Sequence, residues 1–325
     1  MNERWVDNRN SDLEKLEASS ESVAYKHPYY NHSFEEFGKP IQLPNSKGWL
    51  LVRSIPGTAY QDAMGTYPIF CCENWDLLRD DLKDLPEDLV SIVVVTDPFG
   101  QYSRATLEAS FDNVRKFKDH FVLDLTVPLD KSVSKSHRSA ARSALRKLQI
   151  RIVNDPIECI DTWMELYVGM VQKLNISGIR KVSRESIEYQ FKTPGAMLFE
   201  AKVGDQVVGL DMIFIDNDVA YGHLCAFNEL GYKLKASYAT RWRMIEYLID
   251  KVRFLDFGGG LVTKSQSPSD GLTSYKRRWT SETKPVFICS SIINHEVYER
   301  LTSQAGMATT SFFPAYRGGE YLLLT

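Results

Sequence analysis

The stretch MLFEAKVGDQVVGLDMIFIDNDVAYGHLCAF, residues 197–227, carries the strongest indication of the fold. It holds three runs rich in apolar and β-branched residues, separated by short turns at Gly204-Asp205 and at 216–218. Strands joined by turns this short are antiparallel, because a parallel pair needs a long crossover connection. The stretch therefore predicts a three-stranded antiparallel meander.

Residues on both sides of the meander alternate between strand-like and helix-like patterns. The expected strands cover 48–55, 66–72, 89–97, 120–128, 150–155, 253–259 and 286–293. The expected helices cover 73–85, 107–117, the basic segment after 131, 157–174, 237–251 and 295–303. This order predicts an α/β (α+β) protein in which mixed, mostly antiparallel sheets are flanked by helices.

The pattern of strands and helices restarts after Pro128, which indicates two domains. A chain of 325 residues, 43% of them hydrophobic, suits two domains of ordinary size. We expect a loosely attached polar arm over 1–45, an N-terminal α/β domain over 46–130 and a C-terminal domain over 131–325. Both domains have the same kinds of elements, which allows one fold to occur twice.

The composition is typical of a reduced, cytoplasmic protein. No apolar run approaches the roughly 18–20 residues that span a bilayer, and residues 1–15 are too polar for a signal peptide. We therefore expect no membrane span. The five cysteines lack the spacing of metal ligands, so we also expect no metal site. The weak net charge of -3 argues against a general nucleic-acid coat protein.

A basic segment between Lys131 and Arg151 contrasts with this weak overall charge. It has seven Lys and Arg residues and no Asp or Glu, and Arg138, Arg142 and Arg146 follow one another at four-residue, helical spacing. One interpretation is a helix whose charged face is solvated. The other is a site for an anionic partner, because arginine binds phosphate through two parallel hydrogen bonds.

A second segment bears on function: LDFGGGLVTKSQSPSDGLTSYKRRWTSE, residues 255–282. A glycine run after a strand lets the backbone approach a phosphate, but this run lacks the spacing of the known phosphate loops. The other interpretation is a strand-to-loop transition that needs a positive φ.

The basic helix, the meander, DFGG at 256–259 and DGL..YK at 270–276 together resemble the Fem-type aminoacyltransferases and the wider GNAT-like, acyl-CoA N-acyltransferase fold. The resemblance covers about Leu125–Glu282. It implies two GNAT-like domains in tandem and attack by an amine on an activated acyl carbon, either a thioester or an aminoacyl ester. No covalent nucleophile is required, which leaves Cys225 and Cys289 as core residues.

The resemblance places the donor site at 228–237, where GNAT enzymes hold the pyrophosphate of coenzyme A with backbone N–H groups. Leu234 stands where the family has its central glycine. Both an acyl-CoA donor and the aminoacyl-tRNA donor of Fem-type enzymes therefore stay open. The cofactor-binding residues that it implies are Gly231, Lys233, Lys235, Ala236, Ser237 and Arg241.

Acid–base and charged groups are expected around that donor site. Lys276 matches the family's lysine in DGL..YK and can face a phosphate or a developing anion. Strand alternation lets His223 or Asp211 act as general base, although a strand histidine is more often structural. Tyr238 can donate to a leaving group or only pack. The expected substrate-binding residues are Arg138, Arg142, Tyr275 and Arg277.

The resemblance implies an acyl- or aminoacyltransferase that acts on an amine of a small-molecule or cell-envelope precursor. The alternative is a catalytically silent GNAT-like protein that binds an anionic ligand or partner. A nucleic-acid binder acting through 131–151 is the weakest interpretation, because that helix lacks aromatic residues on which bases could stack.

Overall fold

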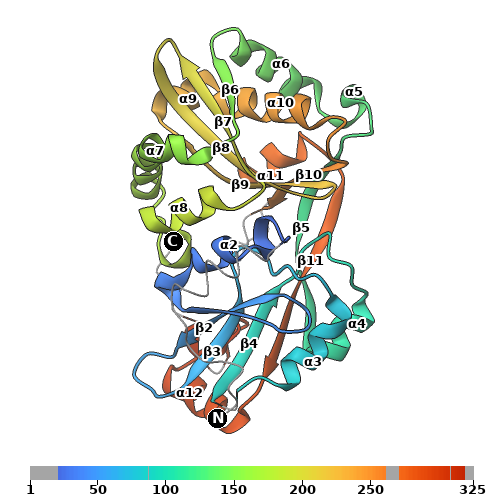
Figure 1. The fold of residues 1–325 in the computed structure, drawn as a ribbon, viewed down its shortest axis with the longest axis vertical. Coiled ribbons are helices and arrows are strands. Elements are labelled where there is room, and N and C mark those ends of the chain that lie inside the picture. Colours follow the sequence, from blue (N-terminus) through green and yellow to red (C-terminus); the bar gives the residue numbers. More distant parts are fainter. Residues whose placement is uncertain (1–20, 87, 261–270, 308, 319–325) are drawn as a thin grey trace. The chain divides into compact units, whose positions relative to one another are not determined.

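The computed structural model describes residues 21–86, 88–260, 271–307 and 309–318 (Figure 1). Within these ranges the chain forms two compact units, each built from segments that are distant in sequence. The first unit takes in the described parts of 1–117, 175–189 and 286–325, and the second takes in those of 118–174 and 190–285. This division differs from the single boundary expected at 130.

The sheet of the first unit has the strand order β1-β2-β3-β4-β11. β3 and β4 pair in parallel, and the other neighbours are antiparallel. The strands are β1 Lys39–Gln42, β2 Trp49–Ser54, β3 Gln61–Gly65, β4 Leu89–Val95 and β11 Thr283–Ile292. The helices are α2 Pro28–His32, α3 Leu78–Lys83, α4 Arg104–Ser110 and α12 His295–Gln304, with 3-10 turns at Ala24–Lys26, Glu35–Phe37, Trp75–Leu77, Gly178–Arg180 and Ala315–Arg317.

The sheet of the second unit has the strand order β5-β10-β9-β8-β7-β6, and only β9 and β10 pair in parallel. The strands are β5 Asn113–Asp124, β6 Gln149–Val153, β7 Ala196–Val203, β8 Gln206–Asp216, β9 Val219–Phe227 and β10 Phe254–Gly259. The helices are α5 Leu129–Ser132, α6 Lys135–Leu145, α7 Ile160–Lys173, α9 Glu229–Leu234, α10 Ala236–Leu248 and α11 Gly271–Arg277, with a 3-10 turn at Pro156–Cys159. A further helix, α8 Arg184–Lys192, has residues 184–189 in the first unit and 190–192 in the second. α10 packs against α6 and on β6–β9, and α7 packs on β8 and β9 (Figure 1).

Both units share one strand pattern, an antiparallel meander whose last strand pairs in parallel with the next strand along the chain. β1–β3 are followed in this way by β4, and β7–β9 by β10. The next strand then changes unit: β5, which follows β4, pairs with β10, while β11, which follows β10, pairs with β4. The expected mixed, mostly antiparallel α/β class with two similar halves is confirmed. The exchange of β5 and β11, together with the segment 175–189 of the first unit, means that no single cut separates the units.

Each unit buries its own hydrophobic core. In the second unit, α10 places Met244, Ile245 and Leu248 against apolar side chains of the sheet. In the first, Trp75 and Cys289 lie in a cluster with side chains from β2, β3 and β4. Cys289 is fully buried, as expected of a core residue.

Residues 21–45 differ from the loose arm that their polar sequence suggests. Tyr25 and Tyr30 are buried and meet edge to face, with ring centroids 4.8 Å apart. The Tyr30 hydroxyl donates to the Tyr67 carbonyl, and the Trp49 indole N–H donates to the Lys26 carbonyl at 3.1 Å. These aromatic side chains bury enough apolar surface to fix the segment. The rest of the expected arm, 1–20, lies outside the described residues.

Several elements differ from the pattern read in the sequence, and β1 and β3 are strands that it did not predict. The helix expected over 107–117 is α4, which ends at Ser110 because Phe111 turns to extended backbone and enters the core; β5 then begins at Asn113. The strand expected over 66–72 is reduced to one bridge between Phe70 and Thr96. α8 was not expected. Among the described residues, no helix has both the length and the apolar character needed to cross a bilayer.

Candidate active site

A buried histidine–aspartate pair lies where β5 meets the end of β10. β10 pairs with β5 regularly up to Asp256, and its register then shifts so that Gly259 faces His120. An irregularity of this kind redirects side chains. It brings His120 Nδ1 to 2.8 Å from Asp256 Oδ2, while Asp256 Oδ1 accepts the Gly258 N–H at 2.7 Å. Both carboxylate oxygens are thus occupied, and the imidazole is held in one orientation.

The Lys276 ammonium reaches the same strand end from α11. Its Nζ donates to the Gly259 carbonyl at 2.6 Å, and Gly259 is the residue that pairs with His120. The Lys118 side chain, from β5, lies against Gly259. Two cations and the His120–Asp256 pair therefore gather around residues 256–259. We call His120, Asp256, Lys118 and Lys276 the strand-end cluster.

The glycines after Asp256 make this close approach possible. Gly258 has φ +73°, and a Cβ there would lie 3.3 Å from Lys276 Nζ. A Cβ on Gly259 would lie 2.6 Å from the Lys118 side chain, which is closer than real contacts allow. The positive φ agrees with a strand-to-loop transition. The run also clears room for the two lysine side chains.

Burial and neighbouring cations change the charge of Lys276. Burial lowers its pKa from the ordinary value of 10.5 to about 8, and repulsion by Arg241 and Lys118 acts in the same direction, against attraction by Asp256. Burial also lowers the pKa of Lys118. Lys276 remains mostly cationic at pH 7 and loses its charge as the pH passes about 8.

Asp211 and Arg241 form a buried ion pair between β8 and α10. Arg241 Nε lies 2.8 Å from Asp211 Oδ2, and the Thr240 hydroxyl donates to the same oxygen at 3.0 Å. Burial raises the pKa of Asp211, partly offset by Arg241. The Arg241 guanidinium also lies over the Phe257 ring, 5.7 Å from its centroid. Asp211 Oδ2 is bound by two side chains of α10, so Asp211 fixes the position of the Arg241 guanidinium.

The Arg241 guanidinium also lies where β9 and β10 separate. The two strands pair only from Phe254 to Asp256 of β10, opposite 219–221 of β9. A Cβ on the next residue of β9, Gly222, would lie 2.6 Å from Arg241 Nη1 and 3.1 Å from the Asp256 carbonyl oxygen. The divergence between the strands therefore begins beside a fixed cation.

Aromatic side chains enclose His137 next to this region. The ring of His137 has its centroid 4.8 Å from that of Tyr238, 5.2 Å from that of Tyr275 and 4.9 Å from that of Trp279. Burial lowers the pKa of His137 to about 4, so it is neutral at pH 7. The Tyr275 hydroxyl donates to the Ser237 carbonyl at 3.2 Å. Tyr238 and Tyr275 thus fix α10 and α11 to each other through packing.

His223 faces away from α10. Its Nε2 lies 3.0 Å from Gln190 Oε1 of α8, and its ring packs on Phe214. The pairing of β8 with β9 shifts between Asp211 and Ile213, which breaks the strict alternation that would have put His223 on the Asp211 side. Burial lowers the pKa of His223 to about 3. The structure therefore places His223 and Asp211 on opposite faces of the sheet.

The expected donor loop, 228–237, is helical. α9 covers most of it, Lys235 adopts the left-handed conformation, and α10 begins at Ala236. The N–H groups of Gly231 and Lys235 already donate to Asn228 Oδ1 and to the Tyr232 carbonyl. Lys233 and Lys235 are exposed. The first part of this segment has its backbone donors engaged within the protein.

Gly231→Ala should destabilise the protein in the absence of any ligand. A Cβ at this position would lie 2.2 Å from the Val208 backbone oxygen, which cannot move aside cheaply. We expect a loss of about 1–3 kcal/mol in the free energy of unfolding, measured by urea denaturation. Gly169→Ala in α7 is the matched control: nothing lies within 4 Å of its Cβ. It should stabilise the protein by about 0.5–1 kcal/mol. Equal effects of the two substitutions would contradict a packing role for Gly231.

The expected substrate-binding arginines lie mainly on the surface of the second unit. Arg142 and Arg277 are exposed, whereas Arg138 is partly buried and donates to the Asp130 carbonyl at 3.5 Å. Arg138 Nε is buried and has no hydrogen-bond partner among the described residues. The basic helix thus has a largely solvated charged face.

Of the residues singled out in the sequence, the structure brings together Lys276, Arg241, Asp211, Tyr275 and Tyr238. Sequence reasoning missed His120, Asp256 and Lys118, although Asp256 stands in the DFGG element. The only signal for His120 was its place in the strand expected over 120–128. Among the described residues, no group of three or more His, Cys, Asp or Glu side chains could hold a metal ion.

Comparisons with known proteins bear on the domain and on the fold. Residues 131–277 match the family described as an acetyltransferase (GNAT) domain. The structure of FemX is 12% identical, with 91% of this chain and 98% of FemX covered and a TM-score of 0.65. L-PGS from Bacillus licheniformis is 11% identical, with coverages of 90% and 96% and a TM-score of 0.62. The C-terminal domain of a proposed lysylphosphatidylglycerol synthetase from Agrobacterium fabrum is 11% identical, with coverages of 91% and 96% and a TM-score of 0.60.

No match emerged from a comparison with curated protein sequences. The likeness to solved structures extends over nearly the whole of each chain and concerns the fold, whereas the family match identifies the domain by its sequence. Residues 131–277 therefore match a GNAT acetyltransferase domain, and the chain shares its fold with FemX, with L-PGS and with the synthetase domain from Agrobacterium fabrum.

Proposed function

We propose that the protein transfers an activated acyl or aminoacyl group to an amine at the strand-end cluster. The observation that carries this proposal is the meeting of the oriented His120–Asp256 pair with the Lys276 ammonium beside Gly259. A base that can take a proton and a cation that can stabilise an oxyanion are the two groups that direct acyl transfer to an amine requires.

In this proposal His120 acts as the general base. Asp256 holds the Nδ1 side of the ring, so that Nε2 can accept a proton from the attacking amine. The amine nitrogen bonds to the acyl carbon, and the carbonyl electron pair moves to oxygen, where Lys276 stabilises the charge. Collapse of the intermediate expels the thiolate or the ribose alkoxide, which takes up the proton that His120 accepted from the amine.

Arg241 supports the same site as a fixed positive charge. It is anchored by Asp211 and lies beside the Asp256 carbonyl, where β9 and β10 diverge. A phosphate-bearing donor in that divergence would lie beside the Arg241 guanidinium, which can bind phosphate through two parallel hydrogen bonds. Arg138, Arg142 and Arg277 would guide an anionic donor from the surface of the unit.

The donor class is the finer part of the proposal. The GNAT domain match supports an acyl-CoA, whereas the fold likeness to FemX supports an aminoacyl-tRNA. The engaged N–H groups of Gly231 and Lys235 disfavour a pyrophosphate held by that backbone, which supports the aminoacyl donor. The test is a single-turnover assay by mass spectrometry, with acetyl-CoA, longer acyl-CoAs and a set of aminoacyl-tRNAs against a panel of amines. Absence of an amide product with every donor would overturn the transferase proposal.

His120→Gln should lower the transfer rate by about 100-fold, because it removes the base but keeps a hydrogen-bonding group of similar size. His223→Gln tests the alternative base indicated by the sequence, and His295→Gln, at an exposed position of the first unit, is the control. We expect the rate to fall with His120→Gln alone, measured on variants of unchanged unfolding temperature. A rate that falls with His223→Gln instead would assign the base to His223, beside Gln190 of α8.

A catalytically silent protein that binds an anionic ligand is the second candidate. It is favoured by the helical 228–235 segment, which departs from a glycine-rich donor loop. This candidate predicts saturable binding of coenzyme A or tRNA, measured by calorimetry, without turnover of any donor.

A further inference from the structure

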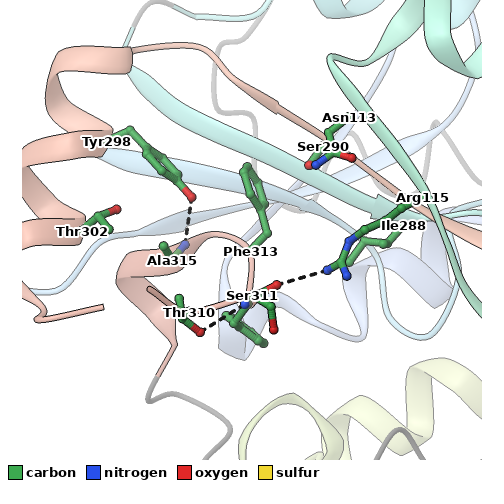
Figure 2. A pocket seen from close by; sticks show the side chains of 11 residues that line it. Asn113, Arg115, Ile288, Ser290, Tyr298, Thr302, Thr310, Ser311, Phe313 and Ala315 are labelled. Carbon is green, nitrogen blue, oxygen red and sulfur yellow. Dashed lines mark hydrogen bonds between the residues drawn. The ribbon is translucent and has the colours of Figure 1, made fainter. Parts of the chain in front are cut away.

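A cavity in the first unit lies outside the strand-end cluster and has no role in the proposed transfer. It has a volume of about 300 Å³ and is lined by residues of β5, β11, α12 and the segment 309–318 (Figure 2). We call 309–318 the C-terminal segment. This volume lies at the lower end of the range for small-molecule sites.

The cavity has a flat, apolar middle. Tyr298 and Phe313 stack with their ring planes 24° apart and their centroids 5.6 Å apart, and Ile288 and Phe312 add further apolar lining. Figure 2 shows the two rings standing side by side. Such a surface suits a planar apolar group.

Polar groups with unused hydrogen-bonding capacity lie on the cavity wall. Arg115 is the one charged residue among those described around it, and its guanidinium makes a single hydrogen bond there, to the Ser311 carbonyl at 3.3 Å. Thr302 is 9% exposed, and its hydroxyl has no hydrogen-bond partner among the described residues. In the view of Figure 2, Arg115 and Thr302 lie well apart, with the two rings drawn between them. A buried hydroxyl left without a partner costs free energy that a ligand can recover.

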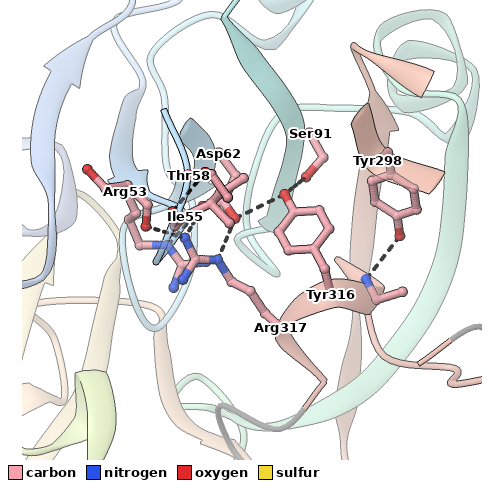
Figure 3. A network of polar contacts seen from close by, with 10 residues as sticks. Arg53, Ile55, Thr58, Asp62, Ser91, Tyr298, Tyr316 and Arg317 are labelled. Atoms are coloured by element: carbon pink, nitrogen blue, oxygen red, sulfur yellow. Dashed lines mark hydrogen bonds and ion pairs between the residues drawn. The ribbon is translucent and has the colours of Figure 1, made fainter. Parts of the chain in front are cut away.

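The wall of the cavity is held in place by contacts within the first unit. The Ala315 N–H donates to the Tyr298 hydroxyl at 3.0 Å, which ties the C-terminal segment to α12. Arg317 and Tyr316 of the same segment donate to the buried Asp62 carboxylate of β3 (Figure 3). The cavity is therefore bounded by a segment fixed at several points.

We propose that this cavity binds a small aromatic carboxylate that carries a polar group at its far end. The carboxylate accepts hydrogen bonds from Arg115, the ring lies along Tyr298 and Phe313, and the polar group pairs with the Thr302 hydroxyl. Arginine favours carboxylates through two parallel hydrogen bonds. An aromatic acid of about twelve non-hydrogen atoms is in proportion to a cavity of this size.

The test uses three probes on the full chain: 3-(4-hydroxyphenyl)propanoate, the corresponding amide, and 3-phenylpropanoate. Binding is followed by saturation-transfer NMR and calorimetry. We expect the acid to bind about tenfold or more tightly than the amide, because the pair with Arg115 is charge-assisted. We expect the hydroxyl to add about threefold to tenfold over the phenyl compound, through the Thr302 hydroxyl.

Two variants separate the contributions. Arg115→Gln should abolish the preference for acid over amide and keep the preference for the hydroxyl compound. Thr302→Val should abolish the preference for the hydroxyl compound and keep the preference for acid over amide. Lys116→Gln, which removes a charge from the neighbouring position of β5, is the control and should keep both preferences. The proposal is overturned if the unmodified protein binds acid and amide equally, or if Lys116→Gln and Arg115→Gln weaken acid binding to the same extent. Neither readout depends on transfer activity, so failure here leaves the proposed function untouched.

Discussion

Lys276→Met should lower the rate of transfer by about 10²–10³-fold, because it removes the cation that would stabilise the oxyanion. The same substitution should raise the stability of the folded protein. Lys276 is buried and repelled by Arg241 and Lys118. Its folded-state pKa of about 8 lies below the ordinary 10.5, so the folded state binds this proton more weakly than the unfolded state does. The loss of folding stability that Lys276 causes is therefore fully present below about pH 8 and fades as the pH rises toward 10.5.

The measurement pairs a rate with an unfolding curve at pH 7. Methionine fills the space of the lysine stem without its charge, so we expect a gain of about 1–2 kcal/mol in the free energy of unfolding. Lys276→Arg is the matched control: it keeps a charge that does not titrate near pH 8. The unmodified protein should lose activity as the pH passes about 8, and Lys276→Arg should lack that decline. A methionine variant that is both active and less stable would remove Lys276 from the mechanism.

The sequence allowed prediction of those parts of the fold that depend on local patterns. The meander at 197–227 follows from its short turns, and α10 and β10 from their periodicity, all three close to the observed bounds. Lys276 was identified because the DGL..YK element is contiguous in sequence. Local patterns of this kind need no knowledge of which distant strand comes to lie alongside.

His120 could not be predicted in this way, because its role depends on a partner 136 residues away. The two side chains meet only because β5 changes unit and because β10 shifts register after Asp256. His223 was a weaker prediction for the same physical reason. A register shift between β8 and β9 breaks the alternation on which the prediction rested.

Asp62→Ala should be the most destabilising single substitution in the first unit. Asp62 is 1% exposed and accepts hydrogen bonds from two buried arginines. Its Oδ1 lies 3.2 Å from Arg53 Nε and 3.1 Å from Arg317 Nη2. The Tyr316 hydroxyl donates to its Oδ2 at 3.1 Å (Figure 3). Removing the carboxylate takes one negative charge and its hydrogen bonds away from two buried guanidinium groups. We expect a loss of about 3–5 kcal/mol in the free energy of unfolding.

The measurement is urea denaturation of Asp62→Ala, Arg317→Met and the double variant. Arg317→Met alone should cost less than Asp62→Ala, because Arg53 and Asp62 still neutralise each other. The double variant should lose less free energy of unfolding than the two single losses added together. The reason is that Arg317→Met removes one of the two guanidinium charges that Asp62 had paired with. Asp80→Ala, which breaks an exposed pair with Lys83, is the control and should change stability by less than about 1 kcal/mol. Strict additivity in the double variant would show that Asp62 and Arg317 contribute independently, and that the C-terminal segment is held by its other contacts.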